Sequence, residues 1–289
     1  MQRGTDTMVR LGAHAFVWIG EWTTESGNRA IEQAAEVGFD FIEIPMLNPA
    51  SFDVNSHREA LKVAGLGATC SLTLPKEAHM PHNPQGAKSF LLAALDKVAE
   101  LGSTYLGGCP PYALGTLTGQ PPTSEELQTI VDCLIEVAAE AKQRGITLGI
   151  EACNRYETYV FNTLADARNV ILRIDADNVK LHGDTYHMNI EEEGFFSPIV
   201  ETADVLDYVH MSESHRGLVG TGTVQWDDVW RALAEVQFKG SLVLESFTAI
   251  NPELAAATCL WRPPNQPPAV LARDGLAFLK SNAAKYGLR

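Results

Sequence analysis

Short apolar runs recur along the chain at regular intervals, and each is about as long as a buried strand. The eight runs are RLGAHAFVW (10–18), FDFIEIPM (39–46), GATCSLTL (67–74), STYLGGCP (103–110), ITLGIEAC (146–153), VKLHGDTY (179–186), LDYVHMSE (206–213) and GSLVLESF (240–247). The segments between them are rich in Ala, Leu and Glu, with apolar residues three and four apart, as in amphipathic helices. The pattern therefore predicts strands that alternate with helices.

Glycine marks the ends of the predicted helices. Five glycines each stand just before an apolar run, at Gly38, Gly65, Gly102, Gly145 and Gly240. This is the helix C-cap position, where a left-handed backbone favours a residue without a Cβ. Eight strand–helix units in about 250 residues are typical of a parallel (β/α)8 TIM barrel. We expect one such domain over residues 1–289, with its last helix over 270–288.

Three connections are longer and richer in Pro and Gly than the others. They cover residues 75–86, 109–124 and 261–268. The first two follow the third and fourth predicted strands, on the face where enzymes of this fold carry their active sites. We therefore expect these loops to surround a functional site.

Composition and charge exclude several classes of function. The formal net charge is −14 without a run of Lys or Arg, so the surface repels phosphate backbones and we expect no nucleic-acid partner. The nucleotide-loop patterns GxGxxG and GxxxxGK[ST] are absent. No apolar stretch approaches the length of a membrane span, and the polar N-terminus MQRGTDTMVR lacks the apolar core of a signal peptide. Five cysteines without a CxxC pair are typical of a reducing compartment, which predicts a cytoplasmic protein without membrane contact.

A carboxylate stands where the fifth apolar run should carry another apolar residue. Glu151 follows Ile146, Leu148 and Ile150 at alternate positions of the run ITLGIE. A buried charge at the end of an apolar strand is costly unless a positive group meets it. The candidate partners of Glu151 are an arginine, a metal ion or a substrate.

Three further polar residues hold the same position in the next three predicted units. Asp184, His210 and Glu245 end the sixth, seventh and eighth predicted strands, as Glu151 ends the fifth, so the four residues are 33, 26 and 35 positions apart. Neighbouring barrel strands lie about 4.8 Å apart, so side chains from four adjacent strand ends can converge. One such residue alone would more typically be a polar side chain at a strand end that forms hydrogen bonds with a neighbouring loop. Together they form a mixed N/O set that favours a divalent ion such as Mn²⁺, Co²⁺ or Mg²⁺ over a structural zinc.

Four local sequences carry a family resemblance. The segments EACNRYE, DTYHMNIEE, HMSESHRG and LESF resemble the D-tagatose 3-epimerase family, also called D-allulose (D-psicose) or ketose 3-epimerases, among the xylose-isomerase-like barrels. The resemblance implies that Glu151, Asp184, His210 and Glu245 hold one divalent metal ion per chain, with Mn²⁺ ahead of Co²⁺ and Mg²⁺. It also implies a homodimer or homotetramer that acts on a small sugar such as D-tagatose, D-fructose, D-allulose or L-ribulose.

The same resemblance assigns roles to individual side chains. It makes Glu151 and Glu245 the acid/base pair that removes and returns a proton at C3 of a ketose, through an enediolate. It gives contacts with substrate hydroxyls to Glu157, His187 and Arg216. From the residues alone, an ion pair of Arg216 with Glu157, or of Glu157 with Arg155, is the alternative.

Strand alternation suggests further walls for a sugar site. If alternation holds, Trp18 and His14 on the first strand, and Cys70 and Leu72 on the third, point into the mouth of the barrel. We therefore expect Trp18 and Cys70 to contact substrate, with a core position as the alternative for Trp18. Trp22 lies in a loop, where it could serve as a lid or an oligomer contact.

Other functions remain compatible with the sequence. An aldose–ketose isomerase, a hydroxypyruvate-isomerase-like enzyme or an inosose-dehydratase-like enzyme would use a similar ligand set, and the carbon that exchanges its hydrogen would distinguish them. An endonuclease of the same superfamily needs a histidine-rich trinuclear site and a basic face, which this acidic chain does not offer. A non-catalytic sugar-binding barrel would not need both glutamates.

Overall fold

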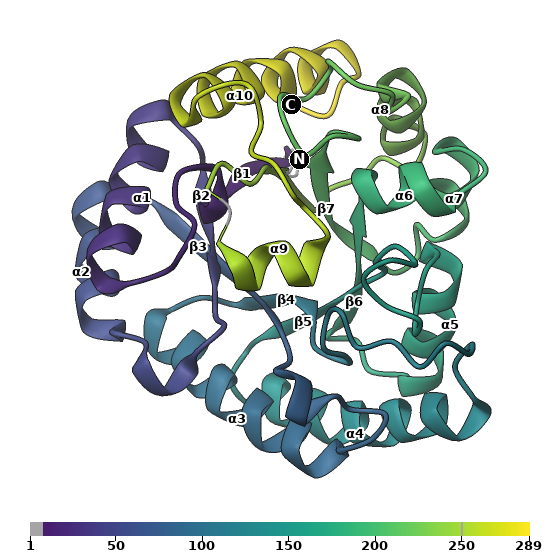
Figure 1. The fold of residues 1–289 in the computed structure, drawn as a ribbon. Coiled ribbons are helices and arrows are strands. Elements are labelled where there is room, and N and C mark those ends of the chain that lie inside the picture. The colour runs from purple at the N-terminus through teal and green to yellow at the C-terminus, as the bar shows by residue number, and fades with distance from the viewer. Residues whose placement is uncertain (1–7, 250) are drawn as a thin grey trace, which may run out of the picture.

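The strands form a closed parallel barrel. The computed structural model describes residues 8–249 and 251–289. The strands pair in chain order around the barrel, and helices surround them (Figure 1). Their bounds are Arg10–His14 (β1), Phe41–Pro45 (β2), Gly67–Thr73 (β3), Tyr105–Cys109 (β4), Thr147–Glu151 (β5), Val179–Asp184 (β6), Leu206–Ser212 (β7) and Ser241–Glu245 (β8). The prediction of a (β/α)8 TIM barrel is confirmed.

The helices follow the predicted order, with additions at the mouth of the barrel. The α-helices are Thr24–Val37 (α1), Val54–Ala64 (α2), Pro84–Leu101 (α3), Ser124–Gln143 (α4), Leu164–Ile174 (α5), Thr185–Glu191 (α6), Phe196–Glu201 (α7), Trp226–Glu235 (α8), Pro252–Thr258 (α9) and Pro268–Lys285 (α10). Short 3-10 helices cover Ala15–Val17 (η1), Pro49–Ser51 (η2) and Lys76–Ala78 (η3). Among the described residues, none of the helices is both long and apolar enough to cross a membrane.

Glycine ends three helices as the pattern predicts, whereas α4 has Arg144 as its C-cap with Gly145 one residue beyond. Gly38, Gly65 and Gly102 are left-handed C-caps of α1, α2 and α3. Gly240 has a different role, because α8 ends at Glu235 and no helix ends at this glycine. A Cβ built on Gly240 would lie 1.9 Å from the carbonyl oxygen of Asp207, so the close approach of two backbones excludes any side chain here.

A small aromatic cluster fills the barrel below the site. Phe41, Tyr105, Tyr208 and Val243 pack together, and the rings of Tyr105 and Tyr208 are stacked with centroids 4.3 Å apart. Gly149 leaves room for this cluster, because a Cβ there would lie 2.0 Å from the Tyr105 hydroxyl. Large rings opposite small residues close the barrel, so only its C-terminal end can hold a ligand.

The connection between β8 and α10 contains a helix that the sequence pattern did not predict. Helix α9 lies in front of the barrel strands in the view of Figure 1, and Glu253, Leu254 and Ala257 line the cavity at the barrel mouth. Asn251 caps its first turn by accepting a hydrogen bond from the backbone N–H of Leu254. Helix α9 therefore narrows the entrance to the site.

Candidate active site and metal centre

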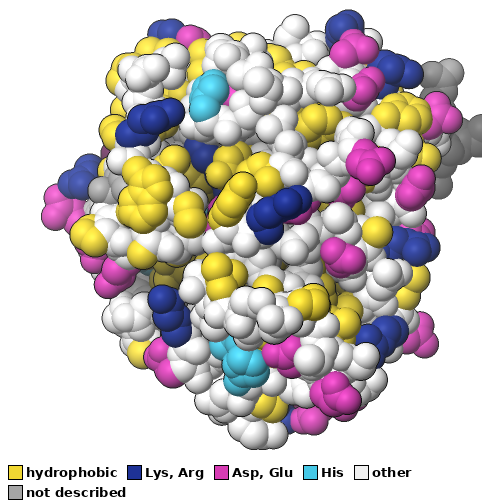
Figure 2. Space-filling view, turned by 45° about the vertical axis from the view of Figure 1, so that its right-hand side comes forward, with side chains coloured by type: hydrophobic (Ala, Val, Ile, Leu, Met, Phe, Trp, Pro, Cys, Tyr) yellow, Lys and Arg dark blue, Asp and Glu magenta, His cyan; other side chains and the backbone are white. Residues whose placement is uncertain are grey.

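A cavity of about 780 Å³ opens at the C-terminal end of the barrel strands. Most of the predicted site residues line it, namely His14, Leu72, Glu151, Glu157, His187, His210, Arg216 and Glu245. On the face drawn in Figure 2, hydrophobic side chains gather near the middle, and acidic and basic side chains are interspersed around them. The cavity is large enough for a monosaccharide and has both apolar and charged walls.

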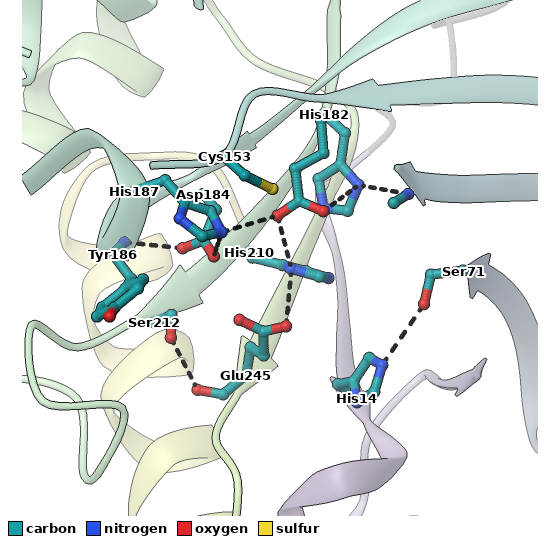
Figure 3. A network of polar contacts seen from close by, with 12 residues as sticks. His14, Ser71, Cys153, His182, Asp184, Tyr186, His187, His210, Ser212 and Glu245 are labelled. Atoms are coloured by element: carbon teal, nitrogen blue, oxygen red, sulfur yellow. Dashed lines mark hydrogen bonds and ion pairs between the residues drawn. The ribbon is translucent and has the colours of Figure 1, made fainter. Parts of the chain in front are cut away.

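The four predicted metal ligands converge from four adjacent strands. Asp184 and His210 stand opposite each other in the pairing of β6 with β7. The Nδ1 atom of His210 lies 3.2 Å from Glu245 Oε1 and 3.7 Å from Glu151 Oε1. Asp184, His210 and Glu245 offer ligand atoms that all lie within 4.8 Å of one another. Figure 3 shows Asp184, His210 and Glu245 pointing toward a common point.

The donor atoms fit a divalent ion. Within residues 8–249 and 251–289, the buried Nδ1 of His210 has no hydrogen-bond partner, although it faces two carboxylates. Donors on a six-coordinate ion with bonds of about 2.1 Å are about 3.0 Å apart when adjacent and about 4.2 Å apart when opposite. The distances of 3.2 and 3.7 Å from His210 to Glu245 and Glu151 fall in this interval. Oxygen and imidazole donors suit Mn²⁺, Co²⁺ or Mg²⁺.

A buried carboxylate that sequence reasoning missed fixes the orientation of His210. Glu43 on β2 is fully buried, and its Oε2 accepts hydrogen bonds from His210 Nε2 at 2.9 Å and from the Tyr208 hydroxyl at 2.6 Å. Burial opposes ionisation of Glu43, but His210 outweighs it and lowers the pKa of this carboxyl. Because Glu43 engages Nε2, the free nitrogen of His210 is Nδ1, the atom that faces the cluster.

Replacing Glu43 by glutamine should weaken metal binding without removing a ligand. We expect the dissociation constant for Mn²⁺ to rise about 10–100-fold, since an outer carboxylate orients the histidine and raises its basicity. Calorimetric titration of chelator-treated protein with Mn²⁺ measures the dissociation constant of each variant. Tyr208→Phe is the matched control, because it removes the other hydrogen bond to Glu43 and leaves the His210 contact in place. Equal affinities of Glu43→Gln and wild type would contradict the role.

Arg216 faces the ligand cluster and not Glu157. Its Nη1 donates to Asp184 Oδ2 at 2.8 Å and to a carboxylate oxygen of Glu245. The guanidinium lies over the ring of Tyr186, 3.7 Å from its centroid. The alternative ion pair of Glu157 with Arg155 is not formed, because Arg155 pairs with Glu191 at 2.8 Å. Arg216 therefore brings a buried positive charge to the metal ligands.

His187 and Glu157 are held together by one asparagine. The backbone N–H and the side-chain amide of Asn154 lie 3.1 and 2.8 Å from His187 Nδ1, and the amide also donates to Glu157 Oε1 at 2.7 Å. Two donors at Nδ1 place the His187 proton on Nε2, although Arg216 Nη2 lies 3.3 Å from that nitrogen. Burial lowers the pKa of His187 and raises that of Glu157 to about 8. His187 is thus a neutral donor near pH 7.

Opposite environments surround the two glutamates of the predicted acid/base pair. Burial raises the pKa of Glu151 well above its usual value, and Cys153 adds to the rise. Burial also opposes ionisation of Glu245, but Arg216 and His210 outweigh it and hold the pKa of this carboxyl well below the usual range. Two carboxylates whose pKa values are pushed apart are typical of an acid and a base that share one substrate.

The loop after β7 is organised by a second carboxylate that sequence reasoning missed. Glu213 is fully buried, and its side chain accepts four hydrogen bonds. The donors are the backbone N–H groups of Ser214, Gly220 and Val224 and the indole N–H of Trp226. Glu213 also accepts the Arg216 backbone N–H through its carbonyl oxygen at 2.8 Å. It therefore fixes the loop from which Arg216 reaches the cluster.

The structure corrects two of the expected substrate contacts. Among the described residues that line the cavity, neither Trp18 nor Cys70 is found. Trp18 follows the 3-10 helix η1, which interrupts strand alternation, and its ring packs edge-on against Phe39 in the core. Cys70 is fully buried in the core between the barrel strands and the surrounding helices, because its neighbours Thr69 and Ser71 take the inward positions of β3. Trp22, by contrast, does line the cavity.

Comparison with known proteins identifies the family. A model of the xylose isomerase-like TIM barrel family matches residues 31–282. The chain belongs to this family. Within the xylose isomerase-like barrels, it is 37% identical over 260 residues to a ketose 3-epimerase of Arthrobacter globiformis, covering 88% of this chain and 90% of the relative. It is 35% identical over 275 residues to an L-ribulose 3-epimerase of Methylomonas sp. (strain DH-1), covering 93% and 96%.

Solved structures of family members share the whole barrel. A crystal structure of D-allulose 3-epimerase from Methylomonas sp. in complex with D-allulose superposes with a TM-score of 0.92 at 34% identity, covering 96% of this chain and 98% of that one. The resemblance to ketose 3-epimerases drawn from the four local sequences is therefore confirmed.

Proposed function

We propose that the chain is a metal-dependent ketose 3-epimerase that interconverts C3 epimers of free ketoses. The observation that carries the proposal is the pair Glu151 and Glu245, two buried carboxylates from strands separated by two others. Both lie close to one histidine nitrogen and line the same cavity. Two bases on opposite sides of one substrate carbon are what epimerisation requires, and the similarity to ketose 3-epimerases supports this assignment.

Glu151, Asp184, His210 and Glu245 would hold the ion in this proposal. A bound divalent ion supplies positive charge that polarises the C2 carbonyl of the ketose and stabilises the enediolate. One glutamate removes the C3 proton as a carboxylate, and the other, as a carboxylic acid, returns a proton to the opposite face. The two exchange these states in each turnover, so the reverse reaction uses them in the opposite roles.

Three other side chains position the sugar. His187 donates from Nε2 to the oxygen at C2 as negative charge grows there. Arg216, already oriented by Asp184 and Glu245, presents a guanidinium for an adjacent sugar oxygen. Glu157 binds the O1 hydroxyl, and Asn154 keeps it beside His187. Phe16, Leu72 and Phe247 supply apolar wall around them.

The proposal includes Mn²⁺ as the resident ion, because the set combines three carboxylates with one imidazole. It also includes a homodimer or homotetramer in the cytoplasm, an expectation that rests on the family resemblance. Metal analysis of the purified protein and its mass by light scattering check these two points.

Proton NMR in D2O tests the proposed reaction. The Mn²⁺- or Mg²⁺-loaded protein is incubated with D-fructose, D-tagatose or L-ribulose, and the H3 signal is followed in aliquots after the metal has been removed. We expect loss of H3 as the C3 epimer appears, because the returned proton comes from solvent-exchanged carboxyl groups. A chelator should abolish both changes, and added Mn²⁺ should restore them.

Two results would contradict the proposal. Exchange at C1 in place of C3 would assign the chain to the aldose–ketose isomerases. Absence of any exchange with all three ketoses, in protein that binds one Mn²⁺, would exclude free ketoses as substrates.

A further inference from the structure

Two cysteines lie beside the proposed acid/base residue on the wall of the cavity. Cys109 is the last residue of β4, and Cys153 follows Glu151, the last residue of β5, by two positions. Both residues are buried within the protein, 3% and 1% exposed, yet both line the cavity. Figure 3 draws Cys153 in the polar network that also contains Asp184, His187 and His210.

The spacing of the two sulfurs matches a shared metal ion better than a disulfide. Cys109 Sγ and Cys153 Sγ are 3.5 Å apart. Two thiolates on a tetrahedral Zn²⁺ lie about 3.8 Å apart, since each Zn–S bond is about 2.3 Å. A disulfide needs about 2.05 Å, so the sulfurs would have to approach by about 1.5 Å. A small outward adjustment therefore makes the pair a chelate.

A third ligand is already in place. Cys109, Glu151 and Cys153 offer one sulfur, one carboxylate oxygen and one sulfur that all lie within 4.8 Å of one another. The catalytic set on the other side of Glu151 contains only oxygen and imidazole donors. Because thiolates select soft ions such as Zn²⁺ and Cd²⁺, the two sides of Glu151 favour different metals.

We propose that Cys109, Cys153 and Glu151 form a second, sulfur-rich site that takes one thiophilic d10 cation, Zn²⁺ or Cd²⁺, from the cavity. Binding releases both thiol protons to solvent, and a water completes the tetrahedron. The ion is an inhibitor, because it holds Glu151 away from the proton that this carboxylate must transfer. The inhibition rests on the proposed epimerase function, whereas the binding does not.

Titration of the Mn²⁺-loaded protein with Cd²⁺ tests the site. The ultraviolet charge-transfer absorption of cadmium thiolate reports the sulfur ligands, and epimerisation is measured in the same samples. We expect one Cd²⁺ per chain, an absorption of two thiolates, and loss of activity in proportion to occupancy. Cys109→Ser and Cys153→Ser should each lose at least half of the absorption. In each variant, the Cd²⁺ concentration that halves the variant's own metal-loaded rate should rise at least tenfold.

Matched controls separate this site from the other thiols. Cys133→Ser changes a cysteine on α4, and Cys259→Ser changes the exposed thiol after α9, so both should retain the full absorption and sensitivity. Unchanged absorption in Cys109→Ser and Cys153→Ser would overturn the proposal, as would inhibition without thiolate absorption, which indicates displacement of Mn²⁺. If the absorption behaves as expected but no ketose is epimerised, the site stands and the proposed function fails.

Discussion

Replacing Glu245 by glutamine should remove epimerisation while leaving the fold intact. An amide can neither accept nor return the C3 proton, and general acid–base groups contribute about 10²–10⁴-fold to rate. We therefore expect kcat to fall by about 10³-fold. The amide oxygen can still act as a ligand, so Mn²⁺ should remain bound. Initial rates for both C3 epimers measure kcat, a thermal melt checks the fold, and a Mn²⁺ titration checks metal binding.

The same variant distinguishes an acid/base residue from one that is only a ligand. With Glu151 intact, the epimer that Glu151 deprotonates should still exchange H3 with D2O and return to itself. The other epimer should not exchange. In Glu151→Gln we expect the opposite result, with exchange only in the epimer that Glu245 deprotonates. Glu235 is a carboxylate at the end of α8, so Glu235→Gln should behave as wild type. Undiminished epimerisation by Glu245→Gln would exclude the role, and equal loss of exchange from both epimers would reduce Glu245 to a metal ligand.

The parts of the site that sequence could predict are those with a local signature. Glu151, Asp184, His210 and Glu245 each put a polar group at the end of an apolar run, and the repeat of one strand and one helix brings them to one end of the barrel. Their convergence follows from topology, so no side-chain detail was needed to expect it.

Glu43 has a related local signature, a carboxylate inside an apolar run, and was still missed. It stands within the apolar run FDFIEIPM, but its partner His210 is 167 residues away in the chain. Only the register of β2 against the rest of the barrel shows that these side chains meet. Contacts across a barrel depend on strand tilt and stagger, which hydrophobic spacing does not encode.

The errors at Trp18 and Cys70 come from extending alternation beyond its range. Strand β1 ends at His14, and the 3-10 helix η1 turns the chain before Trp18. On β3 the inward positions are Thr69 and Ser71, so Cys70 packs toward the helices. A shift of one residue moves every side chain of a strand to the other face of the sheet. A run that is apolar throughout does not indicate which of its residues face into the barrel.

Replacing Glu213 by glutamine should destabilise the protein and weaken catalysis through Arg216. The carboxylate accepts four N–H groups, and an amide turns half of that acceptor surface into a donor. Each buried donor left without a partner costs about 1–3 kcal/mol, so two of them lower the free energy of unfolding by about 2–6 kcal/mol. Urea unfolding of both proteins at pH 7 measures the difference.

The pH dependence of that difference identifies its cause. Burial opposes ionisation of Glu213, but the hydrogen bond from Ser214 and the other three donors outweigh it and lower the pKa of this carboxyl. The stabilisation is therefore present above the unfolded-state pKa of about 4.3, and it is lost as the pH falls through the lower folded-state pKa. We expect the gap between wild type and Glu213→Gln to narrow below about pH 4. A gap that stays constant with pH would assign the effect to packing and not to the charge.

Catalysis by Glu213→Gln separates loop order from general instability. Arg216 has a positive φ of 58° and depends on this loop for its position, so kcat/KM should fall at temperatures where the variant is fully folded. Glu192→Gln is a suitable control, because Glu192 is a partly buried carboxylate that also accepts a backbone N–H, from Leu164, away from Arg216. It should cost stability without the same loss of kcat/KM. Equal losses in both variants would indicate that Glu213 only stabilises the fold.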